Sequence, residues 1–233
     1  MTPPTVLLDL DGTLVDSLPG IEASGRAALA ALGHAPDSTL DIAAMIGPPI
    51  EDMMRLMLAR YGDDRIAEGV AAYRADYGQR GLLGSHPYPG VAEAMAALRE
   101  TGARLILATS KRREFAERIL AHTGFDAFFA AVHGSEPGGD LDHKPELIAH
   151  IARRHGLAPG RCVMVGDRRH DIAGAHANAV RALGVLWGYG TREELETAGA
   201  DGLVAAPDAL ATAVLALVSS SASGTSPSPG RPG

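Results

Sequence analysis

The chain has 233 residues, of which 46% are hydrophobic, enough to fill one large domain or a core domain with an insertion. Its 28 acidic and 21 basic residues give a formal net charge of −7 without any block of lysine and arginine, so we expect no nucleic-acid partner. The sequence has one cysteine, no charged leader and no apolar run approaching the roughly 18 residues of a membrane span. We therefore expect a cytoplasmic protein without a membrane partner or an internal disulfide framework.

Short apolar runs that end in polar or glycine-rich loops alternate with helical patterns along the chain. This alternation predicts an α/β fold, a Rossmann-like parallel sheet with helices on both faces. The predicted strands cover residues 5–10, 104–109, 130–133, 161–165 and 181–186. The predicted helices of the core cover residues 91–100, 113–122, 145–155 and 171–178.

The region from residue 17 to residue 86 interrupts this alternation, because it has no convincing strand and three helical patterns, over 21–32, 50–61 and 64–77. An all-helical block inserted after the first strand predicts a smaller cap domain with hinges at Asp16-Ser17 and at residues 86–90. We therefore predict an α/β core over 1–16 and 87–217 and a helical cap over 17–86. The Ser/Gly/Pro-rich residues 218–233 are predicted to form a disordered tail.

Two aspartates in the stretch DLDGTLVDS follow the first predicted strand. Residues two apart in a strand project to the same face, so Asp9 and Asp11 would place two carboxylates side by side where the strand ends. Like charges at that distance repel unless a cation lies between them or one carboxylate takes a proton.

Three further polar stretches fall at or near the ends of predicted strands, where open parallel sheets bind ligands. They are Thr109-Ser110, Lys144 in the loop before a helix, and the segment from Asp167 to Asp171. Carboxylates gathered without cysteines or paired histidines favour a hard cation, and Mg²⁺ is the natural candidate beside a phosphate. The hydroxyl and ammonium groups are suited to bind that phosphate.

These four stretches, in this order and with a helical insertion after the first, resemble the haloacid dehalogenase superfamily of phosphotransferases. The stretches IGPP at 46–49, YPGV at 88–91 and GYGTREEL at 188–195 look most like its phosphoglycolate phosphatase-like branch. The resemblance implies that Asp9 attacks phosphorus and that Asp11 is the general acid and base. It also implies that Mg²⁺ is held by Asp9, the main-chain carbonyl of Asp11, Asp167 and, directly or through water, Asp171.

The same resemblance implies a phosphate site. Thr109, Lys144 and the backbone N–H groups of Ser110 and of the Leu10–Asp11 turn would hold the phosphoryl oxygens, and Lys144 would also neutralise charge on the nucleophile. Thr13 would orient the general acid through a hydrogen bond.

Each residue also has a structural interpretation. Thr109-Ser110 could cap the following helix, Lys144 could be a solvated loop residue, and Asp167 and Asp171 could be a helix cap and a first-turn acid. Cys162, inside an apolar strand, is interpreted as a packing residue. Arginines near the crevice, Arg168 among them, are predicted to be mostly solvated.

We predict a Mg²⁺-dependent phosphatase acting on a small phosphorylated metabolite through an aspartyl-phosphate, as a monomer or homodimer. A phosphomutase of the β-phosphoglucomutase type is the nearest alternative, because it needs the same two aspartates. A catalytically silent phosphate-binding protein is the alternative from another class.

Overall fold

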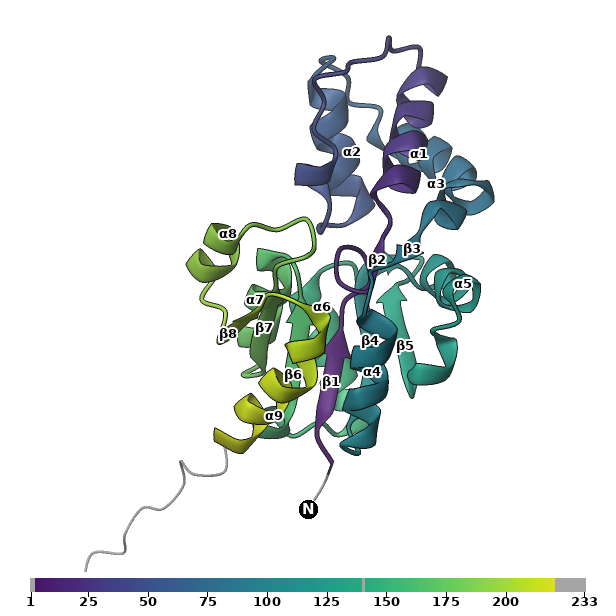
Figure 1. Ribbon diagram of the computed structural model, residues 1–233. Coiled ribbons are helices and arrows are strands. Elements are labelled where there is room, and N and C mark those ends of the chain that lie inside the picture. The colour runs from purple at the N-terminus through teal and green to yellow at the C-terminus, as the bar shows by residue number, and fades with distance from the viewer. Residues whose placement is uncertain (1–2, 140, 221–233) are drawn as a thin grey trace, which may run out of the picture.

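The computed structural model describes residues 3–139 and 141–220. Within them, six parallel strands form one sheet in the order β5-β4-β1-β6-β7-β8 (Figure 1). This confirms the predicted α/β fold. The strands are β1 (Thr5–Leu8), β4 (Arg104–Arg112), β5 (Ala131–Ser135), β6 (Cys162–Gly166), β7 (Arg181–Val185) and β8 (Gly202–Val204).

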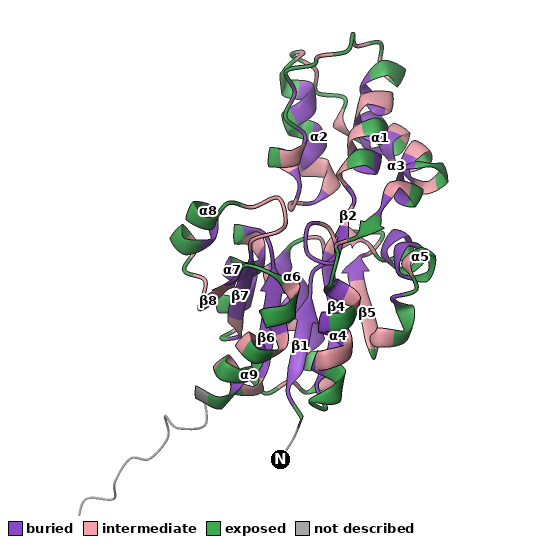
Figure 2. Ribbon diagram, viewed as in Figure 1, coloured by how far each residue is buried: buried purple, intermediate pink, exposed green. Residues whose placement is uncertain are grey.

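Helices cover both faces of the sheet because successive strand residues point in opposite directions. Val6 and Leu8 of β1 belong to a core formed with α4 (Val91–Glu100), α5 (Arg113–Thr123) and α9 (Leu210–Ser220). Leu7 belongs to the opposite core, formed with α6 (Lys144–His155), α7 (Arg169–His176) and α8 (Arg192–Thr197). Figure 2 shows the central strands buried between these two layers.

Three helices, α1 (Leu18–Ala31), α2 (Ile50–Ala59) and α3 (Ile66–Gln79), lie beyond the carboxyl ends of the strands (Figure 1). A short antiparallel ribbon joins them to the sheet domain through β2 (Val15–Asp16) and β3 (His86–Pro87). We refer to residues 17–86 as the cap and to the rest as the core, although the division into two domains stays a prediction. The described 3₁₀ turns are η1 (Ala43–Met45), η2 (Gly81–Gly84), η3 (Asp126–Phe128), η4 (Pro159–Arg161) and η5 (Pro207–Ala209).

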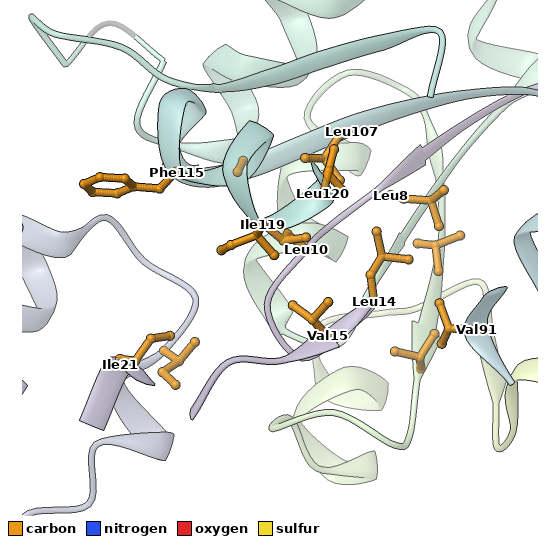
Figure 3. Close-up of a cluster of buried hydrophobic side chains, with 14 of the residues drawn as sticks. Leu8, Leu10, Leu14, Val15, Ile21, Val91, Leu107, Phe115, Ile119 and Leu120 are labelled. Carbon is orange, nitrogen blue, oxygen red and sulfur yellow. The ribbon is translucent and has the colours of Figure 1, made fainter. Parts of the chain in front are cut away.

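Hydrophobic side chains continue from the sheet into the turn after β1. Leu10 and Leu14 in this turn share one buried cluster with Leu107 of β4 and Ile119 of α5 (Figure 3). Ile21 of α1 belongs to the same cluster, so apolar packing extends across the connection between core and cap. Packing against the core therefore fixes the turn that carries Asp11.

The observed elements differ from the predicted ones mainly at their ends. The first strand ends at Leu8 rather than at residue 10, because the Leu10 carbonyl accepts turn hydrogen bonds from the backbone N–H groups of residues 13, 14 and 15. The ribbon β2-β3, strand β8 and helices α8 and α9 were not predicted. Helix α9 continues through Ser220 into the segment predicted to be disordered, because Val218 is buried against the core; residues 221–233 lie outside the described residues.

No described helix combines the length and the apolar character that crossing a membrane requires.

Truncating a side chain at the centre of the sheet should destabilise the protein strongly. Leu107 is fully buried, so Leu107→Ala should lower the free energy of unfolding by about 2–5 kcal/mol through the cavity it leaves. Leu56→Ala is the matched control, because Leu56 is 51% exposed, and it should change that free energy by less than about 0.5 kcal/mol. Urea unfolding followed by circular dichroism measures both, and equal losses would contradict the described packing.

Candidate active site

The predicted polar stretches meet at one edge of the sheet because β1 lies between β4 and β6. Asp9 follows β1, Asp167 follows β6, and Thr109 lies in β4. The Asp9 N–H donates to the carbonyl of Val165 at 3.0 Å, which continues the pairing of β1 with β6 one residue beyond the strand. Sheet geometry therefore positions these side chains over the same crevice.

A glycine lets the turn after β1 pass close to Asp167. Gly12 has a φ of +80°, a conformation that favours glycine. A Cβ atom added there would lie 2.2 Å from the Asp167 Oδ2 atom, so no other residue fits without moving the carboxylate. This close approach brings the turn that holds Asp11 against the acidic residue of the neighbouring strand.

Lys144 lies at the centre of the site. Its ammonium donates to Asp9 Oδ1 and to the carbonyl of Ala108, both at 2.7 Å, and lies 2.6 Å from Asp171 Oδ1. The side chain is only 2% exposed. Burial opposes its charge, but Asp171 and Asp9 together raise the pKa of Lys144 above its ordinary value, so the ammonium stays protonated. The alternative of a solvated loop lysine is wrong.

Three buried carboxylates cluster beside this lysine. Asp9, Asp167 and Asp171 each offer an oxygen, and these oxygens lie within 4.8 Å of one another. Burial raises the pKa of Asp9 to about 6, because desolvation and the charges of Asp171 and Asp11 outweigh the effect of Lys144. Burial and the charges of Asp171 and Asp9 raise the pKa of Asp167 to about 8. A cluster that carries excess negative charge and offers only oxygen ligands is suited to bind a hard divalent cation.

Hydrogen bonds fix the orientation of Asp167. Thr13 Oγ1 donates to its Oδ1 at 3.2 Å, and the Tyr189 backbone N–H donates to its Oδ2 at 2.7 Å. The prediction that Thr13 orients Asp11 is therefore wrong. The hydroxyl reaches the neighbouring strand's carboxylate instead, because Gly12 lets the turn approach it.

Asp11 is held by two other residues. Its Oδ1 accepts a hydrogen bond from Lys111 Nζ at 2.6 Å and another from Ser17 Oγ, at the junction with the cap. Lys111 Nζ also donates to the hydroxyl of Tyr77 on cap helix α3, at 2.6 Å. The sequence analysis assigned no role in the site to Lys111, Ser17 or Tyr77, although it placed Ser17 at a hinge and Lys111 directly follows the predicted Thr109-Ser110 pair.

The predicted phosphate-binding residues surround the same space. Thr109 is buried, and its hydroxyl accepts the backbone N–H of Lys111 at 3.2 Å. Ser110 lies beside Asp9 and Asp11 on the wall of a cavity. The Leu10 side chain is fully buried in the core, so any contact of this residue with a ligand must come from its backbone.

This cavity, of about 80 Å³, lies between core and cap. Its core wall includes Asp9, Asp11 and Ser110, and its cap wall includes Tyr73 and Arg74. The two parts also meet through Arg168, a buried residue that donates to the carbonyl of Ile46 in the cap and pairs with Glu194 at 3.0 Å. The prediction of a solvated arginine is wrong for Arg168.

Comparison with known proteins identifies the family of the chain. The family model described as haloacid dehalogenase-like hydrolase matches residues 3–178, and a second, HAD-hydrolase-like model matches residues 142–217. A predicted phosphatase from Clostridium acetobutylicum has a similar crystal structure, with a TM-score of 0.85 and 30% identity, covering 93% of this chain and all of that one.

Relatives of the chain carry names that indicate different activities. The chain is 41% identical to a 5'-nucleotidase of Pseudomonas aeruginosa, covering 82% of this chain and 86% of the relative. It is 39% identical to the tyrosine-protein kinase PtkA of Mycobacterium tuberculosis, covering 84% of this chain and 66% of the relative. It is 30% identical to a phosphoglycolate phosphatase of Neisseria gonorrhoeae, covering 79% of this chain and 80% of the relative. The chain therefore belongs to the haloacid dehalogenase-like hydrolases, in the phosphoglycolate phosphatase-like branch, and is a phosphatase of phosphoric monoesters.

Proposed function

We propose that this phosphatase is Mg²⁺-dependent and hydrolyses small phosphomonoesters through an aspartyl-phosphate on Asp9. The observation that carries the proposal is the position of Asp9, which lines the cavity while its Oδ1 pairs with a buried ammonium at 2.7 Å. That pairing neutralises the carboxylate as a negatively charged phosphate approaches it. A carboxylate held in this way is suited to attack phosphorus.

The chemistry divides between two carboxylates. A carboxylate oxygen of Asp9 forms a bond to phosphorus while the bond from phosphorus to the ester oxygen breaks, and Asp11 passes its proton to the departing alkoxide. In the second step Asp11 takes a proton from water as that water attacks phosphorus. Asp9 leaves as a carboxylate, and phosphate is released.

Other residues hold the phosphoryl group and the cation. Lys144 and Thr109, with the backbone N–H groups of Ser110 and of the Leu10–Asp11 turn, would bind the phosphoryl oxygens. Asp9, Asp167, Asp171 and the main-chain carbonyl of Asp11 would hold Mg²⁺, which when bound supplies positive charge to the phosphoryl oxygens.

The size of the cavity supports a small substrate. About 80 Å³ is far below the roughly 300–1,000 Å³ of sites for drug-sized ligands, and it suits a phosphoryl group with a short chain. A nucleoside would require the cap to move away. We therefore favour small phosphoacids such as phosphoglycolate over nucleotides, and hydrolysis over transfer to a sugar.

Stability of the metal-free protein should fall as pH rises. The pKa values of Asp9 and Asp167 in the folded state are about 6 and about 8, whereas the ordinary value is 3.8. At a pH between 3.8 and the folded pKa of each group, the folded state therefore binds more protons than the unfolded state. Raising the pH removes these protons and the stability that they contribute. Mg²⁺ replaces them, so the difference in melting temperature between Mg²⁺ and EDTA should be larger at about pH 8 than at about pH 5.5.

Scanning fluorimetry at both pH values measures this effect. In the Asp167→Asn variant, Mg²⁺ should raise the melting temperature much less, because the substitution removes one carboxylate ligand of the cation. A stabilisation by Mg²⁺ that is equal at both pH values, or greater at the lower one, would contradict the described cluster.

Removing the proposed nucleophile should abolish turnover while the fold is kept. Asp9→Asn preserves the side-chain volume and relieves repulsion within the carboxylate cluster, so phosphate release should fall by about 10³-fold or more. Asp126→Asn, on the exposed surface, is the matched control and should keep full activity. Residual activity of Asp9→Asn within about tenfold of the parent, ~1.4 kcal/mol in barrier terms, would reject the covalent mechanism.

A panel of phosphate esters separates the possible substrates. With Mg²⁺, kcat/KM should be higher for phosphoglycolate and similar small phosphoacids than for nucleoside 5'-monophosphates, because of the cavity size. A preference for nucleotides would contradict the small-substrate proposal. Isomerised sugar phosphate without phosphate release would indicate a mutase, and binding without any turnover would indicate a silent phosphate-binding protein.

A further inference from the structure

Lys111 is a buried cation in the site to which the proposed mechanism assigns no role. Its side chain is 8% exposed, and its ammonium lies 2.6 Å from Asp11 Oδ1 and 2.6 Å from the Tyr77 hydroxyl. The same nitrogen lies 4.7 Å from the centroid of the Tyr77 ring, on the side of its hydroxyl group. Burial of this amine is therefore compensated by two hydrogen bonds, one to each of these residues.

These contacts connect three separate parts of the chain. Lys111 lies near the end of β4, Asp11 lies in the turn after β1, and Tyr77 lies on cap helix α3. Tyr77 is fully buried and packs edge-on against Phe115 of α5, with ring centroids 5.6 Å apart. The tyrosine hydroxyl reaches Lys111 only when α3 lies against the core, so the contact depends on the position of the cap.

The hydrogen bonds to Asp11 leave one of its oxygens available. Lys111 Nζ and Ser17 Oγ both donate to Oδ1, and no described residue makes a hydrogen bond to Oδ2. Because Oδ1 already accepts two donors, the proton that Asp11 passes to a leaving group is placed on Oδ2. Asp11 lines the cavity, and the two hydrogen bonds to Oδ1 restrict the rotation of its carboxyl group.

We propose that Lys111 is a positioning residue, which fixes the carboxyl group of Asp11 for proton transfer and is itself held in place by Tyr77 when the cap lies on the core. This inference rests on the proposed role of Asp11 as general acid and base. It links the position of the cap to the geometry of proton transfer as well as to substrate fit. Helix α3 would thus fix the general acid Asp11 in position only when the cap encloses a substrate.

Two substrates of nearly equal shape distinguish a defect in proton transfer from a defect in substrate binding under the cap. Phenyl phosphate has a strongly basic leaving group that needs a proton, whereas 4-nitrophenyl phosphate has a weakly basic one that needs little help. Loss of acid positioning should slow the first far more than the second. A defect in cap packing alone should slow both alike, because the two rings make similar contacts.

The experiment measures kcat and KM for both esters, with Mg²⁺, on the full-length parent and its variants. Lys111→Met should lower kcat for phenyl phosphate by about 10²-fold or more and kcat for 4-nitrophenyl phosphate by about tenfold or less. Lys111→Arg, which keeps the charge and the donors, should recover part of the loss. Tyr77→Phe should change the ratio of the two kcat values in the same direction by a smaller factor.

The double variant and a matched control complete the test. Combining Lys111→Met with Tyr77→Phe should change the ratio no further than Lys111→Met alone, because the two residues act through one contact. Asp76→Asn is the control: one residue before Tyr77, it removes the negative charge and the Oδ2 acceptor that bind Arg80 within the cap while its amide oxygen can still accept the Ser24 hydroxyl, and it should leave the ratio unchanged.

The outcomes separate this inference from the proposed function. A parent enzyme that releases no phosphate with Mg²⁺ would reject the proposed function. An active parent whose ratio is unchanged in Lys111→Met, shown by circular dichroism to be folded, would overturn the role of Lys111. If that variant does not fold, Tyr77→Phe decides, and an unchanged ratio there overturns the proposal.

Discussion

The rest of the site depends on the pairing of the buried Lys144 ammonium with the carboxylates of Asp9 and Asp171. One ammonium is set against three clustered acids, so Asp9, Asp167 and Asp171 carry more negative charge than the protein compensates. Such an imbalance costs stability unless protons or a cation relieve it. The requirement for a cation and the capacity to receive a phosphate thus follow from the same local charge arrangement.

Strand order and one glycine bring these groups together. Since β1 lies between β4 and β6, the acids after β1 and β6 become neighbours although about 158 residues separate them along the chain. Gly12 then lets the turn pass within contact of Asp167. The cap completes the site from the opposite side through two contacts. The hydroxyl of Tyr77 binds Lys111, which in turn donates to the core acid Asp11, and the carbonyl of Ile46 accepts a hydrogen bond from the core residue Arg168.

The sequence predicted those parts of the molecule that depend on local pattern. Apolar runs placed the main strands, and the polar residues that follow them placed Asp9 and Asp167 at one edge of the sheet. The side-chain partners of Thr13, Lys111 and Arg168 could not be predicted, because they lie 26 to 154 residues away and depend on how cap, turn and core pack. A lysine or arginine in a loop has the same local pattern whether it is solvated or buried.

The most direct test of the central claim is calorimetric titration of the metal-free protein with Mg²⁺ at pH 7, in two buffers that differ in ionisation enthalpy. Asp167, with a pKa of about 8, is largely protonated at that pH, and Asp9, at about 6, only slightly. We expect one Mg²⁺ per chain and the release of about one proton on binding, seen as a difference in apparent enthalpy between the buffers. Binding without proton release, or no binding of Mg²⁺ at all, would contradict the claim that the buried carboxylates bind Mg²⁺ in exchange for a proton.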